Sequence, residues 1–432
     1  PPGQQQPGEA ERLKQHNQGL HAVAILPDAM RCATRFSLFL AKWPAGFHCL
    51  AMESTPSAPE AAPELSPELR RQILRWLWKW CGRIAFVSMV LWTAMVLLVA
   101  LVFRFLGETN LCTAFLLFAP PSVWLLPGIV IWPVTLLFRW RAALLLGAVV
   151  ALVTFMSSGW RMSSPAEPVA MEKRSTNTLV LLTNNRGQTG GHSIRPFKNH
   201  IQPDMMAFQE SSVPWTTYLA DPGYAEFKFG ASVNEYTLIS RFPVMPGQLL
   251  SWSGGRVTTP FHYGARFEVD WAGRKVAVYV IHLRSPRDSL LSLRWGSFIR
   301  GIPLPFGSWR ERAEKDMAFW RDQWSMAEAL KNRFKVETLP YMVAGDFNAP
   351  HFGAVHRLIA ADLQDAHAQA GHGFGFTFPG DTRNPLAFGG PWMRIDHIFA
   401  DPHWSVEACW TEDERKSQHR AVAAALQWKG DS

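Results

Sequence analysis

Cysteine is almost absent from the C-terminal part of this chain, where Cys409 is the only cysteine beyond residue 172. A disulfide framework or a cysteine-based zinc site needs several cysteines at suitable spacings. Residues 172–432 therefore have neither.

An excess of charge of one sign is also lacking in this part. Residues 172–432 hold 29 Lys and Arg against 26 Asp and Glu, and much of the net charge of +8 lies before them. No run of basic and aromatic residues follows the pattern of a groove for a nucleic-acid backbone. Composition thus gives no strong indication of nucleic-acid binding.

Charge is missing altogether from three long apolar segments, Ile84–Phe103, Leu111–Phe138 and Ala142–Met156. The first is long enough to cross a bilayer, the second contains four prolines that predict a kinked span, and the third is marginal in length. A buried helical hairpin or a signal peptide explains so much apolar sequence less well. We expect a membrane domain over residues 70–158 with three transmembrane helices.

The cations that flank these segments predict the orientation. Five Lys and Arg residues precede the first segment between Arg70 and Arg83, and Arg139 and Arg141 separate the second from the third. By the positive-inside rule these are the cytoplasmic sides. Three spans then place the chain after Met156 on the non-cytoplasmic side of a multi-pass protein, of bacterial inner-membrane type. The prediction reverses if the third segment does not cross.

The residues before and after the three apolar segments differ in composition. Residues 1–69 are expected to be disordered, since the stretch before the first apolar segment is rich in Pro, Ala, Glu and Ser. The chain begins with Pro-Pro-Gly, and Met52 is our expected natural start. Residues 159–177 are expected to be a linker, and residues 178–432 a catalytic domain.

Apolar runs that end in a polar side chain recur along this domain. Residues i and i+2 of an extended chain point to one face, so Asp346 and Asn348 after the strand Tyr341–Ala344 should project together. Each such end has an ordinary interpretation as a turn or a surface residue when taken alone. The same pattern places four further candidates at strand ends: Asn185, Glu210, His282 and His419.

The stretch Trp392–Phe399 adds a carboxylate inside an apolar strand. Asp396 and Arg394 are expected on one face of it, where a plain ion pair between them is the simple alternative. Apolar positions at helical spacing predict a helix over Ser308–Phe334.

Together these residues are the parts that a metal-assisted phosphoryl hydrolase needs. One carboxylate can hold a divalent cation, another can orient water, and amides and imidazoles can donate to phosphate oxygens. A further carboxylate can fix one histidine tautomer.

In their residues and in their order along the chain, the motifs of Thr178–Leu426 resemble those of the endonuclease/exonuclease/phosphatase family. The matching stretches are Thr183-Asn184-Asn185, Gln209-Glu210, Ile239-Ser240-Arg241-Phe242-Pro243, His282-Leu283, Gly345-Asp346-Phe347-Asn348, Arg394-Ile395-Asp396-His397-Ile398 and Ser417-Gln418-His419. The resemblance implies an α/β fold, a four-layer α/β/β/α sandwich of two mixed sheets with helices outside.

The resemblance also implies roles. Glu210 is expected to be the principal ligand of Mg²⁺ or Mn²⁺, with Asn185 beside it, and Asp346 to orient or deprotonate the attacking water. Phosphate oxygens would be bound by three residues, Asn185, Asn348 and His282. The last expected element is a hydrogen-bonded pair at the scissile phosphate, formed by Asp396 and His419.

One departure from the family pattern is Gln418, where the family usually has Asp. We expect a membrane-anchored, divalent-metal-dependent phosphoesterase, with a catalytically impaired protein that binds a phosphorylated ligand as the alternative. Nucleic acid, phospholipid and sugar phosphate stay open as substrates, the bilayer is the expected partner, and no protein partner can be inferred. Ser285–Gly307 is expected to be a packed loop, although its three arginines would also suit lipid headgroups.

Overall fold

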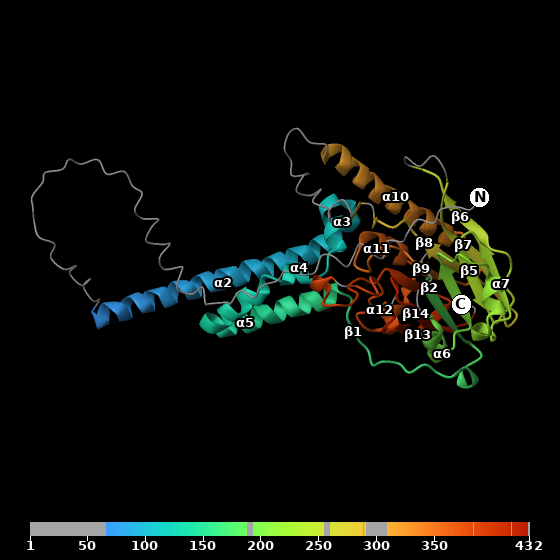
Figure 1. Ribbon diagram of the computed structural model, residues 1–432, viewed down its shortest axis with the longest axis horizontal. Coiled ribbons are helices and arrows are strands. Elements are labelled where there is room, and N and C mark those ends of the chain that lie inside the picture. Colours follow the sequence, from blue (N-terminus) through green and yellow to red (C-terminus); the bar gives the residue numbers. More distant parts are fainter. Residues whose placement is uncertain are drawn as a thin grey trace, which may run out of the picture. The chain divides into compact units, whose positions relative to one another are not determined.

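The computed structural model describes residues 66–187, 193–254, 260–287, 289–290, 309–382, 384–415 and 417–430. The expected disorder and start site before residue 66, and most of the expected packed loop Ser285–Gly307, lie outside these residues. Two six-stranded sheets and a group of long apolar helices form the described part (Figure 1).

The two sheets are mixed, as predicted. The first has the order β10-β12-β9-β8-β7-β6 and the second the order β13-β14-β2-β3-β5-β4. The strands of the first are β6 Gln248–Trp252, β7 Phe261–Trp271, β8 Arg274–His282, β9 Tyr341–Asp346, β10 Gln364–Asp365 and β12 Asp396–Ala400. Those of the second are β2 Thr178–Asn185, β3 Met205–Gln209, β4 Phe229–Val233, β5 Tyr236–Ser240, β13 Trp404–Thr411 and β14 Val422–Trp428.

Strand β8 explains why the sheets stack, because it is apolar on both faces. Val276, Val278 and Val280 pack into the core between the two sheets. Tyr279 and Ile281 alternate with them and pack on the outer face of the first sheet. A strand buried on both sides needs a sheet on one face and helices on the other, which defines the four-layer sandwich.

The helices supply the outer layers (Figure 1). α10 (Trp309–Lys335) and α11 (Ala354–Ala360) contribute Met326, Leu330 and Val355 to the core over the first sheet. α6 (Arg195–Ile201) and α7 (Trp215–Ala220) cover the second sheet. α12 (Ala366–Ala370) and the two-stranded pair of β1 (Arg161–Met162) with β11 (His372–Gly373) complete this part. The predicted helix over Ser308–Phe334 is α10.

Two stretches of described helix are long and apolar enough to cross a membrane: α2 (Pro67–Phe105) and residues Ser122–Ser157, which hold α4 (Ser122–Leu125) and α5 (Gly128–Ser157). The predicted second and third spans therefore share one stretch, and η3 (Gly107–Thr109) and α3 (Leu111–Leu117) connect it to α2. The number of spans stays a prediction.

Helix α5 breaks at Arg139, whose φ of −144° and ψ of 57° are not helical. Trp132 Nε1 donates to Ala143 O at 3.1 Å. In a continuous helix, eleven residues would separate these positions by about 16 Å. The halves before and after Arg139 therefore fold back on each other.

The long apolar helices contact the two-sheet domain through the end of α2 and the segment that follows it. Glu108 in η3 accepts hydrogen bonds from the backbone N–H groups of Ala354 and Val355 at the start of α11. Phe103 stacks on Phe352 with ring centroids 5.5 Å apart. The expected linker 159–177 also contacts this domain, since it contains β1.

Candidate active site

Three predicted site residues form one row across the first sheet. His282 on β8 is the register partner of Asp346 on β9, and Asp346 is the register partner of Asp396 on β12. Gly345 allows this close pairing, because a Cβ there would lie 2.0 Å from Ile281 O. The strand ends predicted from sequence thus meet at one edge of the sheet.

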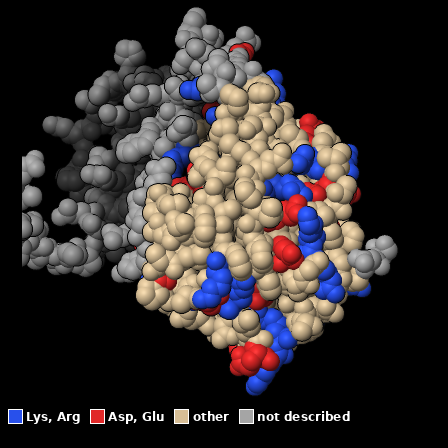
Figure 2. All heavy atoms as spheres, turned by 90° about the vertical axis from the view of Figure 1, so that its right-hand side faces the viewer, with Lys and Arg blue, Asp and Glu red and all other residues tan. Residues whose placement is uncertain are grey.

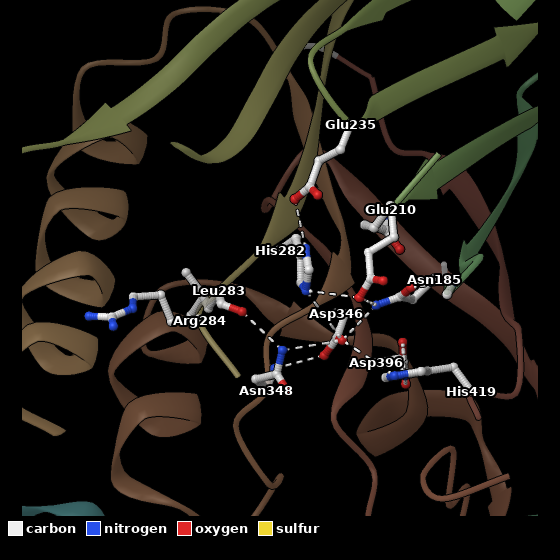
Figure 3. Close-up of polar contacts among 12 residues, drawn as sticks. Asn185, Glu210, Glu235, His282, Leu283, Arg284, Asp346, Asn348, Asp396 and His419 are labelled. Carbon is white, nitrogen blue, oxygen red and sulfur yellow. Dashed lines mark hydrogen bonds and ion pairs between the residues drawn. The ribbon is translucent and has the colours of Figure 1, made fainter. Parts of the chain in front are cut away.

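The second sheet brings Asn185 and Glu210 against this row. Asn185 Nδ2 donates to Glu210 Oε1 at 3.1 Å and to Asp346 Oδ2 at 2.9 Å, so it joins the two sheets (Figure 3). Glu210 has a φ of 49°, in the left-handed region that non-glycine residues rarely adopt. Such strained positions cluster at functional sites. Here the strained residue is the carboxylate predicted to hold a metal.

Asp346 is the centre of the site, and only 1% of its surface is exposed. Its carboxylate accepts from the backbone N–H of Asn348 at 2.8 Å and from Asn348 Nδ2 at 3.3 Å. Burial raises the pKa of Asp346, and the positive charge of His419 opposes the rise. A buried carboxylate with a raised pKa is a stronger proton acceptor than an exposed one.

The predicted pair of Asp396 and His419 is present. His419 Nδ1 lies 3.0 Å from Asp396 Oδ2, and its Nε2 lies 3.7 Å from Asp346 Oδ2. Burial alone would lower the pKa of His419, but Asp396 and Asp346 outweigh it and raise the value to about 9. The ring of Phe378 packs at 4.9 Å from the imidazole. With this pKa, His419 is a buried cation at neutral pH.

His282 has a partner that sequence reasoning missed. Glu235 Oε1 accepts from His282 Nδ1 at 2.8 Å, which leaves Nε2 facing Glu210 Oε1 at 3.6 Å (Figure 3). Burial alone would lower the pKa of His282, but Glu235 and Asp346 raise it. Glu235 lies in the two-residue turn between β4 and β5, where no sequence signal connects it with His282.

The structure corrects the expected placement of Arg394, which precedes β12 rather than lying in it. Its guanidinium donates to both oxygens of Asp365 at 2.9 and 3.0 Å, and not to Asp396. It also lies 3.0 Å from His397 Nδ1. The simple alternative of an Arg394–Asp396 ion pair is therefore wrong, and Asp396 is available to His419.

Two groups among the described residues bring three possible metal ligands within 4.8 Å of one another: Asp346 with Asp396 and His419, and His356 with Asp365 and His397. The second group already surrounds the guanidinium of Arg394. In the first, His419 would have to lose its proton before it could ligate a cation. The best fit for a hard divalent cation is the side of Asp346 that faces Glu210, where two carboxylates share the amide of Asn185.

The amides of Asn185 and Asn348, which are predicted to bind metal or phosphate, already make hydrogen bonds within the protein. Asn185 faces Glu210 and Asp346 with Nδ2, while its Oδ1 accepts from Gly187 N at 2.9 Å, so the amide would have to turn to ligate a metal beside Glu210. Asn348 Nδ2 donates to Leu283 O at 2.9 Å in addition to Asp346. Gln418, the departure from the family pattern, is exposed and lies outside the buried group.

The comparisons with known proteins agree with this geometry. A profile of the Endonuclease/Exonuclease/phosphatase family matches residues 166–419. The chain belongs to this family, whose members are hydrolases of phosphoester bonds.

A search of curated proteins found no match. Among solved structures, a humanized TDP2 from D. rerio is 16% identical with a TM-score of 0.41, over 59% of this chain and 100% of that one. A mannosyl-6-phosphatase from Bacteroides thetaiotaomicron is 15% identical with a TM-score of 0.39, over 58% of this chain and 100% of that one. Likenesses this distant do not identify a substrate.

Proposed function

We propose that this protein is a membrane-anchored, divalent-metal-dependent phosphoesterase. The observation that carries the proposal is that six predicted site residues, in or next to strands of both sheets, surround the buried carboxylate of the seventh, Asp346 (Figure 3).

Glu210 is the proposed metal ligand, with Asp346 and Asn185 next to it. Its side chain is 23% exposed and so can be reached by a cation from solvent. The bound Mg²⁺ or Mn²⁺ would neutralise negative charge on a phosphate oxygen.

Asp346 is the proposed acceptor of a proton from water. The amides of Asn185 and Asn348 hold its carboxylate in one orientation. To donate to a phosphate oxygen as well, Asn185 would give up its bond to Glu210 and Asn348 its bond to Leu283 O. His419, kept cationic by Asp396, would stabilise the negative charge that develops in the transition state. His282, oriented by Glu235, would donate through Nε2 to another phosphate oxygen.

The membrane anchor of this proposal is the bundle of α2 with the two halves of α5. Thr135 Oγ1 donates to Ala85 O at 3.0 Å, which joins the first half of α5 to α2. Val96 of α2 and Val150 in the second half belong to one apolar cluster. Three antiparallel spans would place the chain after α5 on the opposite side of the membrane from the N-terminus, as the flanking cations predict.

Nucleic acid is the substrate class with least support. On the face of the catalytic domain in Figure 2, the described Lys and Arg residues lie interspersed with Asp and Glu, with no extended basic patch. An ester that does not need a long basic track, such as a phospholipid or sugar phosphate, fits better.

The test uses the full-length protein in detergent with bis(4-nitrophenyl) phosphate and a titration of Mg²⁺ or Mn²⁺. We expect metal-dependent turnover that His419→Ala reduces by about 10²- to 10⁴-fold. Retained metal binding without turnover would instead support the impaired phosphoryl-ligand binder.

A further inference from the structure

An apolar groove of about 810 Å³ lies between α5 and the loop 374–392. Its walls include Trp132, Ala148 and Ala151 on α5 and Phe376, Phe388 and Trp392 on the loop. No described residue that lines this apolar groove is charged. Pockets for small molecules typically measure about 300–1,000 Å³, so the size suits a ligand.

One wall of the apolar groove belongs to the proposed membrane anchor. The groove runs along the fold-back of α5, where Trp132 meets Ala143 across the break at Arg139. Its rim includes exposed apolar side chains of α5, with Ile129 at 66% and Leu144 at 49%. In the proposed anchor these surfaces would face hydrocarbon, so the groove would open to the bilayer and its acyl chains.

The other wall is a loop of the catalytic domain that is fixed to the anchor. Trp392 Nε1 donates to Phe118 O at 3.1 Å, and Ser122 Oγ donates to Leu386 O. Phe374 stacks on Phe155 of α5 with centroids 6.0 Å apart. These contacts hold the loop against the anchor along the groove.

The same loop reaches the active site within two residues of the groove. Phe376 lines the groove, while Phe378 packs on the imidazole of His419. Between them, Thr377 Oγ1 accepts from the backbone N–H of Asp396 at 3.2 Å. Two residues of extended chain span about 7 Å. A molecule with its apolar part in the groove can therefore place a polar part near His419.

A buried hydroxyl in the wall also lacks a partner. Thr154 lines the apolar groove, and its buried Oγ1 has no hydrogen-bond partner among the described residues. A hydrocarbon-only ligand would leave it unsatisfied, whereas an ester carbonyl at the head of an acyl chain could accept from it once the side chain turns toward the groove.

We propose that the apolar groove binds an acyl chain of a phosphate-ester lipid whose headgroup phosphate lies at Asp346 and His419. This rests on the proposed function and names its substrate class. The bilayer delivers the lipid laterally, and the loop 374–392 sets the distance from acyl chain to phosphate.

The test compares two substrates in full-length protein with Mg²⁺: phosphatidylglycerol in vesicles and soluble bis(4-nitrophenyl) phosphate. Ala151→Trp fills the groove from an exposed position on α5. Leu152→Trp is the matched control, because Leu152 is exposed at 61% on the same helix and does not line the groove. We expect Ala151→Trp to lower kcat/KM for the lipid at least about tenfold, with the soluble ester and the control variant unchanged.

A second measurement does not depend on turnover. Phosphatidylglycerol with a photoreactive diazirine on its acyl chain should label peptides from residues 374–392, and Ala151→Trp should prevent the labelling. Equal effects of Ala151→Trp on both substrates, or no effect on either, would overturn the inference. Labelling of residues 374–392 without hydrolysis of either ester would refute the proposed hydrolase while supporting the groove as an acyl-chain site.

Discussion

Two buried clusters of histidine and aspartate lie on the same sheet and differ in what balances their charge. Around Asp365, the guanidinium of Arg394 supplies a permanent cation. His397 is neutral there, because burial and its neighbours His356 and Arg394 hold its pKa well below its usual range. Around Asp346 the carboxylates outnumber the cations, and the pKa of His419 is raised.

The difference separates a structural network from a reactive one. A buried carboxylate with a permanent partner in direct contact is satisfied and holds the fold together. A cluster with an excess of negative charge attracts protons and cations. Groups whose pKa is perturbed in this way are typical of functional sites. The Asp346 cluster should therefore control catalysis and the Asp365 cluster stability.

The largest expected effect is on turnover. Asp346→Asn keeps the shape of the side chain but removes the proton acceptor, so the rate should fall by on the order of 10⁴-fold. Asp362→Asn is the control, because that side chain is 72% exposed on the same domain. Steady-state rates with bis(4-nitrophenyl) phosphate provide the measurement, and a loss below about tenfold would assign the proton transfer to another group.

The next effect is on stability. Asp365→Ala leaves Arg394 buried without its carboxylate, which should cost about 3–5 kcal/mol of unfolding free energy. Asp362→Ala should cost less than about 1 kcal/mol, because its ion pair with Lys331 is exposed. Guanidinium unfolding of the protein in detergent measures both. An unchanged stability for Asp365→Ala would mean that the two clusters do not differ as we describe.

A double-mutant cycle tests whether Asp396 and His419 act as one unit. His419→Ala should reduce the rate by about 10²- to 10⁴-fold, and adding Asp396→Asn should cost little more. Independent, multiplicative losses would show that Asp396 does not act through His419. Circular dichroism of each variant controls for folding.

The smallest expected effect is a shift in titration. In protein stripped of metal, NMR should show that His419 titrates at about 9, above its ordinary value of 6.5. At pH 7 it is therefore protonated, and it loses its proton as the pH rises through about 9. Asp396→Asn should lower this pKa, because the carboxylate of Asp396 beside Nδ1 is the largest influence that raises it. A wild-type value at or below 6.5 would contradict the assignment.

Much of the site was predictable because its residues lie at the ends of apolar strands. The pattern placed Asn185, Glu210, His282 and Asp346 there, and the folded sheets bring them together. Glu235 was not predictable, since its bond to His282 depends on how a hairpin turn of one sheet lies over the other.

The fold was predictable to the level of its layers but not of its contacts. The alternation of side chains between the two faces of β8 is a local property of the sequence. The partner of Arg394 is Asp365, which lies 29 residues away in the chain, so no local pattern identifies it. The break of α5 at Arg139 lies where Arg139 and Arg141 separate two uncharged segments of the sequence, but the contact of Trp132 with Ala143 across it was not predictable.

Metal dependence tests the central claim most directly. Full-length protein treated with EDTA should have no turnover, and Mg²⁺ or Mn²⁺ should restore it. Glu210→Ala should be inactive at the metal concentration that saturates the wild type and recover in part at a large excess, because the main ligand is lost. Full activity in EDTA, or a Glu210→Ala variant with the wild-type metal requirement, would contradict the account.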